Sequence, residues 1–261
     1  MIKVSHETPL CLLEDSEKFN DYDYCLPHLL DKEEVYLEYF KQAKEKGRYI
    51  IMDNSLHELG KAYNTSRLLY WINQLSPNEF IIPDVWEDFS KNIQNAREWS
   101  KVDLGNNFTE KVAVIQSTSY SETVKSVSIL KDLGYKKLAF SYGAQYYQEI
   151  FPHPNPHISK MLGRVKTITD LYKNDVLTDF DRVHLLGCQL PQEFVYYQEF
   201  KFIETIDTSS PIMATIDGLK LEDYGLLEKP KSNINNNLYT ETLNWELLDF
   251  NLKKFRKINK L

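Results

Sequence analysis

An alternation of short apolar runs with amphipathic helical stretches is the sequence feature that most constrains the fold. We predict strands at Ile2–Val4, Tyr49–Met52, Glu79–Ile82, Val112–Ile115, Lys137–Phe140, Val183–Leu186, Phe202–Ile206 and Ile212–Ile216. We predict helices at Lys32–Lys46, Ser66–Gln74, Trp86–Ser100, Ser121–Leu133, Ile158–Asn174 and Pro191–Gln198. Continuous apolar strands that alternate with such helices indicate a parallel sheet covered by helices.

The number and spacing of these strands favour a (β/α)8 barrel, that is, a TIM barrel. Such a barrel commonly needs ~250 residues, and this chain has 261. A doubly wound sheet is the alternative, but neither GxGxxG nor GxxxxGK[ST] occurs among the 9 glycines. We therefore expect no dinucleotide or other cofactor. Residues 1–261 are predicted to form one domain with a helical, basic tail at 240–261.

Charge and cysteine content limit the class of function. The net charge is −7, so contact with a long nucleic acid would require a local basic patch such as the C-terminal tail. Cys11, Cys25 and Cys188 are isolated, which argues against a disulfide framework and against a cysteine zinc site. The sequence shows no signal-peptide or membrane-spanning pattern, so we expect an intracellular, cytoplasmic protein.

Polar residues follow the predicted strands, at the edge where a parallel barrel builds its active site. These strand ends carry Asp53-Asn54-Ser55, Pro83-Asp84, Gln116-Ser117, Ser141-Tyr142-Gly143, Gly187-Cys188-Gln189 and Asp207-Thr208-Ser209. A single Asp after a strand is commonly a turn former or a helix N-cap. Three Asp and two Gln at equivalent positions are instead expected to converge on one pocket.

Converging carboxylates support two kinds of chemistry. One is the binding of a hard divalent cation by oxygen ligands. The other is glycosidic-bond chemistry, in which one carboxylate attacks the anomeric carbon and another moves protons. The neutral amides of the two glutamines and Asn54 suit a planar, multiply hydrogen-bonding ligand such as a nucleobase.

Two segments in the second half of the chain resemble the tRNA-guanine transglycosylase family. The segment from His184 to Phe194 (HLLGCQLPQEF) is similar to the family pattern yLMGvGxPxdl. The segment from Glu204 to Pro211 (ETIDTSSP) is similar to the pattern mFDCvxPTR. Asp207 and Pro211 match the nucleophilic Asp and the Pro of that pattern at the same mutual spacing.

Four further segments agree with the same family in their order along the chain. Ile50–Ser55 resembles xLTDSGGFQ, whose Asp is the general acid/base. Phe80–Asp84 resembles the element whose Asp reads the guanine edge, and Val114–Ser117 resembles IVQG, whose Gln binds the base. Leu138–Gly143 resembles xAIGGLAVG, whose backbone contacts the heterocycle. The resemblance therefore covers most of the predicted barrel.

The chain departs from the family pattern at positions that bear on the substrate. Asn54–Leu56 replaces Gly-Gly-Phe, and Ser141–Tyr142 replaces the paired glycines. The Arg after Pro211 is missing, with Ile212 and Met213 instead. The family's C-terminal zinc site of three Cys and a His is absent, since no cysteine follows Cys188. That zinc subdomain helps the tRNA enzymes dock tRNA. The resemblance is therefore closest to short phage-type DNA 7-deazaguanine transglycosylases that lack the zinc site.

The resemblance implies base exchange through a covalent Asp–glycosyl intermediate, without a cofactor or a metal. Asp207 would attack C1′ of a guanosine nucleotide, and Asp53 would move the proton of the departing and arriving bases. The base would be held by Asp84, Gln116, Ser141, Tyr142, Gly143, Gln189 and Asn54. The implied partners are nucleic acid, with DNA preferred over tRNA, and a free 7-deazaguanine such as preQ0 or preQ1. We expect a monomer, because the family often dimerises through the missing zinc region.

Two other functions stay open at this point. Water in place of an incoming base would make the chain a nucleoside or DNA N-glycosylase on the same scaffold. The altered positions after Asp53 and Pro211 also allow a catalytically inactive barrel that only binds a base or a nucleic acid.

Overall fold

Eight parallel strands form the sheet of this protein. The computed structural model describes residues 2–105 and 108–261. The strands are β1 (Lys3–Ser5), β2 (Asp23–Cys25), β3 (Ile50–Met52), β4 (Glu79–Ile81), β5 (Glu110–Ile115), β6 (Lys137–Ser141), β7 (Arg182–Leu186) and β8 (Ile203–Asp207). Their order is β1-β8-β7-β6-β5-β4-β3-β2, and every described register is parallel. Parallel strands in chain order, alternating with helices, confirm the predicted (β/α)8 TIM-barrel class.

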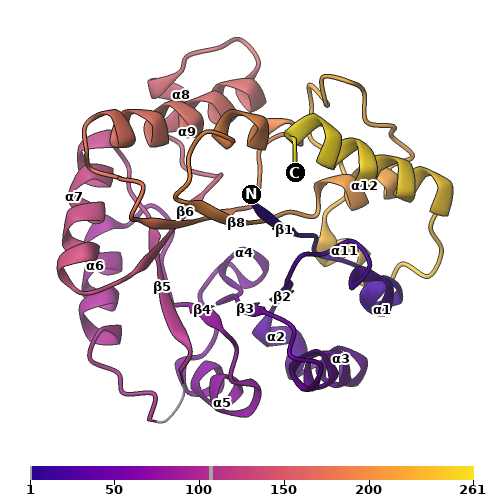
Figure 1. The fold of residues 1–261 in the computed structure, drawn as a ribbon, viewed down its shortest axis with the longest axis horizontal. Coiled ribbons are helices and arrows are strands. Elements are labelled where there is room, and N and C mark those ends of the chain that lie inside the picture. The colour runs from indigo at the N-terminus through magenta and orange to yellow at the C-terminus, as the bar shows by residue number, and fades with distance from the viewer. Residues whose placement is uncertain (1, 106–107) are drawn as a thin grey trace. The chain divides into compact units, whose positions relative to one another are not determined.

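Helices separate the strands along the chain (Figure 1). The longer ones are α3 (Glu34–Glu45), α5 (Thr65–Leu75), α6 (Phe89–Trp99), α7 (Tyr120–Asp132), α9 (Pro156–Lys173) and α12 (Trp245–Asn259). The shorter ones are η1 (Leu10–Leu12), α1 (Leu13–Ser16), α2 (Pro27–Leu30), α4 (Leu56–Leu59), α8 (Tyr147–Ile150), η2 (Glu193–Tyr197), α10 (Ser210–Ile216) and α11 (Ile234–Asn237). Five of these six longer helices, all except α3, begin with a side chain that accepts from a backbone N–H group: Asn64, Asp88, Ser119, Asn155 and Asn244.

The contacts of the chain divide it into two compact units. We call Tyr22–Phe140 the central unit. The terminal unit joins the residues up to Asp21 with Ser141–Leu261. The single-domain organisation of residues 1–261 stays a prediction.

The central unit places the ends of its strands in register. Residues of β3 and β4 are buried throughout, as expected for strands with helices on one side and a core on the other. Met52 pairs with Phe80 across β3 and β4, and Ile81 pairs with Val112 across β4 and β5. Because the strands are parallel and aligned, the residues that follow them share one edge of the sheet.

The terminal unit joins the first strand to the last. β1 pairs with β8, with Ser5 opposite Asp207, and β8 pairs with β7. The C-terminal helix α12 contacts α10 and η2. Apolar side chains from α10, α12 and the N-terminal segment form one buried cluster: Leu12, Ile212, Met213, Ile234, Leu248 and Leu252. The basic tail predicted from the sequence is therefore a packed helix with one apolar face.

Three sequence predictions about these elements are corrected by the structure. Ile212–Ile216 is not a strand but lies in helix α10, whose first turn contains Pro211. All of Ser210–Thr215 is buried, so the segment lacks the period that identifies an amphipathic helix. The segment predicted as the helix Pro191–Gln198 is a shorter 3-10 helix, η2. The strand β2 was missed because its three residues include an acidic one.

Candidate active site

The central unit brings three predicted base-binding residues together. Asn54 follows β3, Asp84 follows β4 and Gln116 follows β5. The Asn54 side-chain amide donates to Asp84 Oδ1 at 2.6 Å, and the Gln116 amide donates to Asp84 Oδ2 at 2.7 Å. All three side chains are buried. The edge that the sequence predicted therefore carries a carboxylate held between two amides.

Asp53 belongs to the same cluster through Asn54, its neighbour in the chain. Its Oδ1 accepts a hydrogen bond from the Tyr24 hydroxyl at 2.9 Å, and its Oδ2 accepts from the Ser55 backbone N–H at 2.9 Å. Ser55 adopts the left-handed conformation, with φ of 57°, and its hydroxyl lies 2.8 Å from His28 Nδ1. Tyr24 was not recognised from the sequence, because it lies in the missed strand β2.

Asp84 is the carboxyl of this cluster with a raised pKa. Burial raises the pKa of Asp84 to about 6, and the negative charge of Asp53 adds to that rise. The hydrogen bonds from Gln116 and Asn54 act in the opposite direction, because they favour the carboxylate. The group therefore changes its protonation state close to neutral pH, as groups at functional sites often do.

The terminal unit holds Asp207 at the end of β8. Both carboxylate oxygens accept from the Gly187 backbone N–H, each at 3.2 Å. His184 Nε2 lies 3.0 Å from Oδ1, and His184 Nδ1 lies 2.8 Å from the Thr205 hydroxyl. His184 is buried and in contact with the predicted nucleophile, a contact that the sequence did not predict.

The loop after β6 lies against the loop after β7 within the terminal unit. The Tyr142 backbone N–H donates to the Leu186 carbonyl at 3.2 Å, and the Gly143 N–H donates to the Ser141 hydroxyl at 3.3 Å. A side chain at Gly187, where φ is +58°, would place its Cβ 2.5 Å from the Tyr142 ring. Glycine is thus required at that position both by the backbone conformation and by the close ring.

The side chain of Gln189 contacts helix α9. Its side-chain Nε2 lies 2.5 Å from His157 Nδ1, on the first turn of α9. Its backbone N–H donates to Glu193 Oε2 at 2.9 Å. The described contacts of Gln189 therefore fix the loop, and its role in holding a base stays a prediction.

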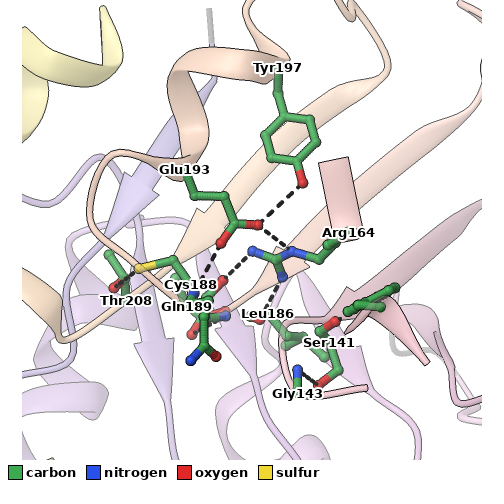
Figure 2. A network of polar contacts seen from close by, with 12 residues as sticks. Ser141, Gly143, Arg164, Leu186, Cys188, Gln189, Glu193, Tyr197 and Thr208 are labelled. Atoms are coloured by element: carbon green, nitrogen blue, oxygen red, sulfur yellow. Dashed lines mark hydrogen bonds and ion pairs between the residues drawn. The ribbon is translucent and has the colours of Figure 1, made fainter. Parts of the chain in front are cut away.

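A buried ion pair supports the loop that carries Gly187 (Figure 2). Arg164 of α9 and Glu193 lie 2.6 Å apart, and both side chains are 0% exposed. Arg164 also donates to the backbone carbonyls of Leu186 at 3.0 Å and Gly187 at 2.8 Å. The Tyr197 hydroxyl donates to Glu193 at 3.2 Å. The guanidinium thus fixes both carbonyls beside the N–H that contacts Asp207, a role that nothing in the sequence indicated.

Neither a metal site nor a membrane span is found in the part of the chain that the structure describes. Among residues 2–105 and 108–261, no three His, Cys, Asp or Glu side chains are grouped so that they could hold a metal ion. Cys11, Cys25 and Cys188 are all free thiols. None of the described helices combines the length and apolar character that crossing a membrane requires.

Comparison with known proteins adds no family to this description. No family model matches the chain, and no curated protein matches it.

Proposed function

We propose that this chain is a base-exchange glycosyltransferase that replaces guanine in a nucleic acid by a 7-deazaguanine, with DNA preferred over tRNA. The observation that carries the proposal is the carboxylate of Asp207, held at the end of β8 by N–H donors on Gly187 and His184. Those donors orient the carboxylate while leaving lone pairs for attack on carbon.

The acid–amide cluster of the central unit supplies the second argument. Asp84 with the amides of Asn54 and Gln116 offers both acceptors and donors within one buried group. A guanine edge carries N–H donors beside a carbonyl acceptor, and such an array reads it well. Asp53, whose oxygens accept from Tyr24 and from the Ser55 N–H, is the carboxyl proposed to carry the proton.

The proposed reaction proceeds in two balanced steps. In the first, a carboxylate oxygen of Asp207 bonds to C1′ of the target nucleotide, the C1′–N9 bond breaks, and guanine leaves with a proton from Asp53. In the second, Asp53 takes a proton from the incoming 7-deazaguanine, whose nitrogen attacks C1′ and displaces Asp207. The enzyme returns to its starting state, so the exchange needs no external energy source.

The resemblance to the tRNA-guanine transglycosylases does not extend to their zinc site. The described residues provide no set of ligands for it, and no step of the proposed reaction uses a metal. The proposal of DNA as the preferred polymer rests on this difference, because the zinc subdomain helps those enzymes bind tRNA.

Release of labelled guanine tests the proposal directly. The protein is incubated with guanine-labelled single-stranded DNA, and separately with labelled tRNA, with and without preQ0. We expect repeated release from DNA only when preQ0 is present; without it, release should stop at about one guanine per protein molecule, once the Asp207 adduct has formed. Repeated release without an added base would instead show a hydrolase, the alternative N-glycosylase.

Substitution of the nucleophile gives the second test. We expect Asp207→Asn to lower exchange by more than about 10⁴-fold, because the covalent step is lost. Asp249→Asn, which changes an exposed carboxyl on α12, is the control and should leave exchange unchanged. Mass spectrometry of the protein quenched without preQ0 should find a pentosyl adduct on the peptide that contains Asp207. Full activity of Asp207→Asn would refute the proposed function.

A further inference from the structure

Lys229 is held in place by the loops at the active-site edge of the terminal unit. It lies in the segment that follows α10. The backbone carbonyl of Leu226 accepts from the Gln192 side chain at 3.0 Å, and that of Leu227 accepts from the Asn155 side chain at 3.0 Å. Asn155 also caps α9, so the segment before Lys229 is anchored to structured elements on both sides.

The ammonium group of Lys229 lies over the ring of Tyr142, with Nζ 3.8 Å from the ring centroid. Burial lowers the pKa of Lys229, Cys188 and Glu193 raise it, and the positive charges of Arg164 and Lys160 lower it. Glu193 is already paired with Arg164. The Lys229 ammonium is thus half-buried without a carboxylate of its own among the described residues, and a bound anion would offset the cost of that burial.

A second lysine lies at the same loop. Lys160 projects from α9 one turn before Arg164, and its Nζ is 3.4 Å from the carbonyl of Gly143. Within the described residues, neither Lys160 nor Lys229 forms an ion pair with a carboxylate. The positive charge of Lys160 contributes to lowering the pKa of Lys229. Local positive charge of this kind is notable in a chain whose net charge is −7.

We propose that Lys229 and Lys160 form a phosphate-binding subsite at the loop after β6, which takes a phosphodiester of the single-stranded nucleic acid substrate. Lysine contacts to phosphate position a nucleic acid without reading its sequence. This inference rests on the proposed function, since it names how that substrate is held beside Asp207.

Binding of a fluorescent single-stranded oligodeoxynucleotide at several salt concentrations tests the subsite without any chemistry. We expect Lys229→Met to weaken binding about 3- to 10-fold at low salt, the scale of one lost charge contact. The slope of log K against log salt concentration should fall by about 0.7 for each phosphate contact removed from a single strand. The double variant Lys160→Met/Lys229→Met should lose about twice as much slope.

Lys220→Met is the matched control. The Lys220 ammonium lies 4.3 Å from the Phe250 ring centroid, so it makes the same type of ring contact in the same unit, near α12. Its removal should leave the slope unchanged. The thermal midpoint of each variant is measured alongside, and Lys229→Met should retain a cooperative transition. An unchanged slope in folded Lys229→Met and in the double variant would overturn the subsite.

Two further results distinguish the subsite from a site for free phosphate and from the proposed function. Inorganic phosphate alone should bind weakly. If it binds tightly and Lys229→Met abolishes that binding, the ligand of the subsite is free phosphate and not a single-stranded nucleic acid, which overturns the proposal. If guanine exchange is absent but the slope still falls in Lys229→Met, the subsite stands and the proposed function fails. If exchange occurs but the slope does not change in Lys229→Met, the proposed function stands and the subsite fails.

Discussion

Among the described residues, a deeply buried pair of a basic side chain with a glutamate occurs in each unit, and the two pairs differ in their other contacts. In the central unit, Lys137 donates to both oxygens of Glu79, which also accepts from the Tyr49 hydroxyl. Both partners are the first residues of their strands, β6 and β4. They therefore lie at the end of the strands opposite the candidate active site.

The pair in the terminal unit lies at the end of β7, beside the candidate active-site residue Asp207. Arg164 shares its donors between Glu193 and the carbonyls on either side of the β7 strand end, Leu186 and Gly187. The same physical interaction thus supports strand assembly in one unit and the geometry of an active-site loop in the other. A planar guanidinium with five donors is suited to the second task, whereas a lysine ammonium is not.

The largest predicted effect comes from breaking each pair. Arg164→Met and Lys137→Met should each lower the free energy of unfolding by about 3–5 kcal/mol, because each leaves a buried carboxylate without its partner. Urea unfolding measures this loss. Guanine exchange, measured at low temperature where both variants are folded, should fall strongly for Arg164→Met and stay near the wild-type rate for Lys137→Met.

Arg164→Lys sharpens the same comparison. It keeps a positive charge beside Glu193, so it should recover part of the stability, but it cannot bond both loop carbonyls and should not recover the exchange rate. Equal losses of exchange in Arg164→Met and Lys137→Met would show that the two pairs do not differ in function.

A second contrast concerns two glycines with positive φ. Gly187→Ala should lower the free energy of unfolding by about 2–3 kcal/mol, from the left-handed backbone and from the contact with Tyr142. Gly134→Ala, in the central unit, has the same kind of backbone but open space around the new methyl group. It should cost about 1–2 kcal/mol. Only Gly187→Ala should impair exchange. Thermal denaturation measures the stability of both variants, and the guanine-release assay measures their exchange rates.

Asp84 gives a pH dependence that the terminal unit should not share. Its pKa of about 6 lies above the ordinary value of 3.8, so the folded state binds the extra proton between these two pH values. Stability contributed by this group should therefore decrease as pH rises from about 4 to 6. Binding of free guanine should show the opposite trend and weaken about tenfold per pH unit below 6, because the protonated group loses an acceptor.

Calorimetry of guanine binding and urea unfolding across this pH range measure the two trends. Asp84→Asn should flatten both curves, since an amide does not titrate. A binding curve for wild type that is flat down to pH 5 would separate Asp84 from base recognition.

The smallest effects are expected at two serines in the left-handed conformation. Ser76→Gly should raise the free energy of unfolding by up to about 1 kcal/mol, because Ser76 ends α5 at φ of 44°. Ser55→Gly should be close to neutral, because the relief of its backbone is offset by loss of the hydrogen bond to His28. A clear stabilisation by Ser55→Gly would show that the His28 contact contributes little.

The sequence predicted the fold class and the central cluster because both depend on local patterns. Apolar runs mark buried strands. Asn54, Asp84 and Gln116 follow three aligned strands, so the parallel strand order alone predicts that they lie close together. Helix α10 was mistaken for a strand because burial on every side removes the helical period.

The supporting residues were not predictable in the same way. Arg164, Glu193 and Lys229 act through contacts with residues far away in the chain, and no local pattern distinguishes them from surface charges. His184 pairs with Thr205 and so shares a face of the sheet with Asp207. Because the register shifts between Val183 and His184, alternation along the strands alone did not place it there.

The pairing of β1 with β8 also has a consequence for how the chain is made. Lys3 meets Thr205, so the first strand emerges from the ribosome about 200 residues before its partner, a delay of ~10–40 s at typical synthesis rates. During that time the central unit, which is continuous in sequence, can fold first. Until β8 has been synthesised, the edge of β1 that pairs with it is unpaired and accessible to chaperones.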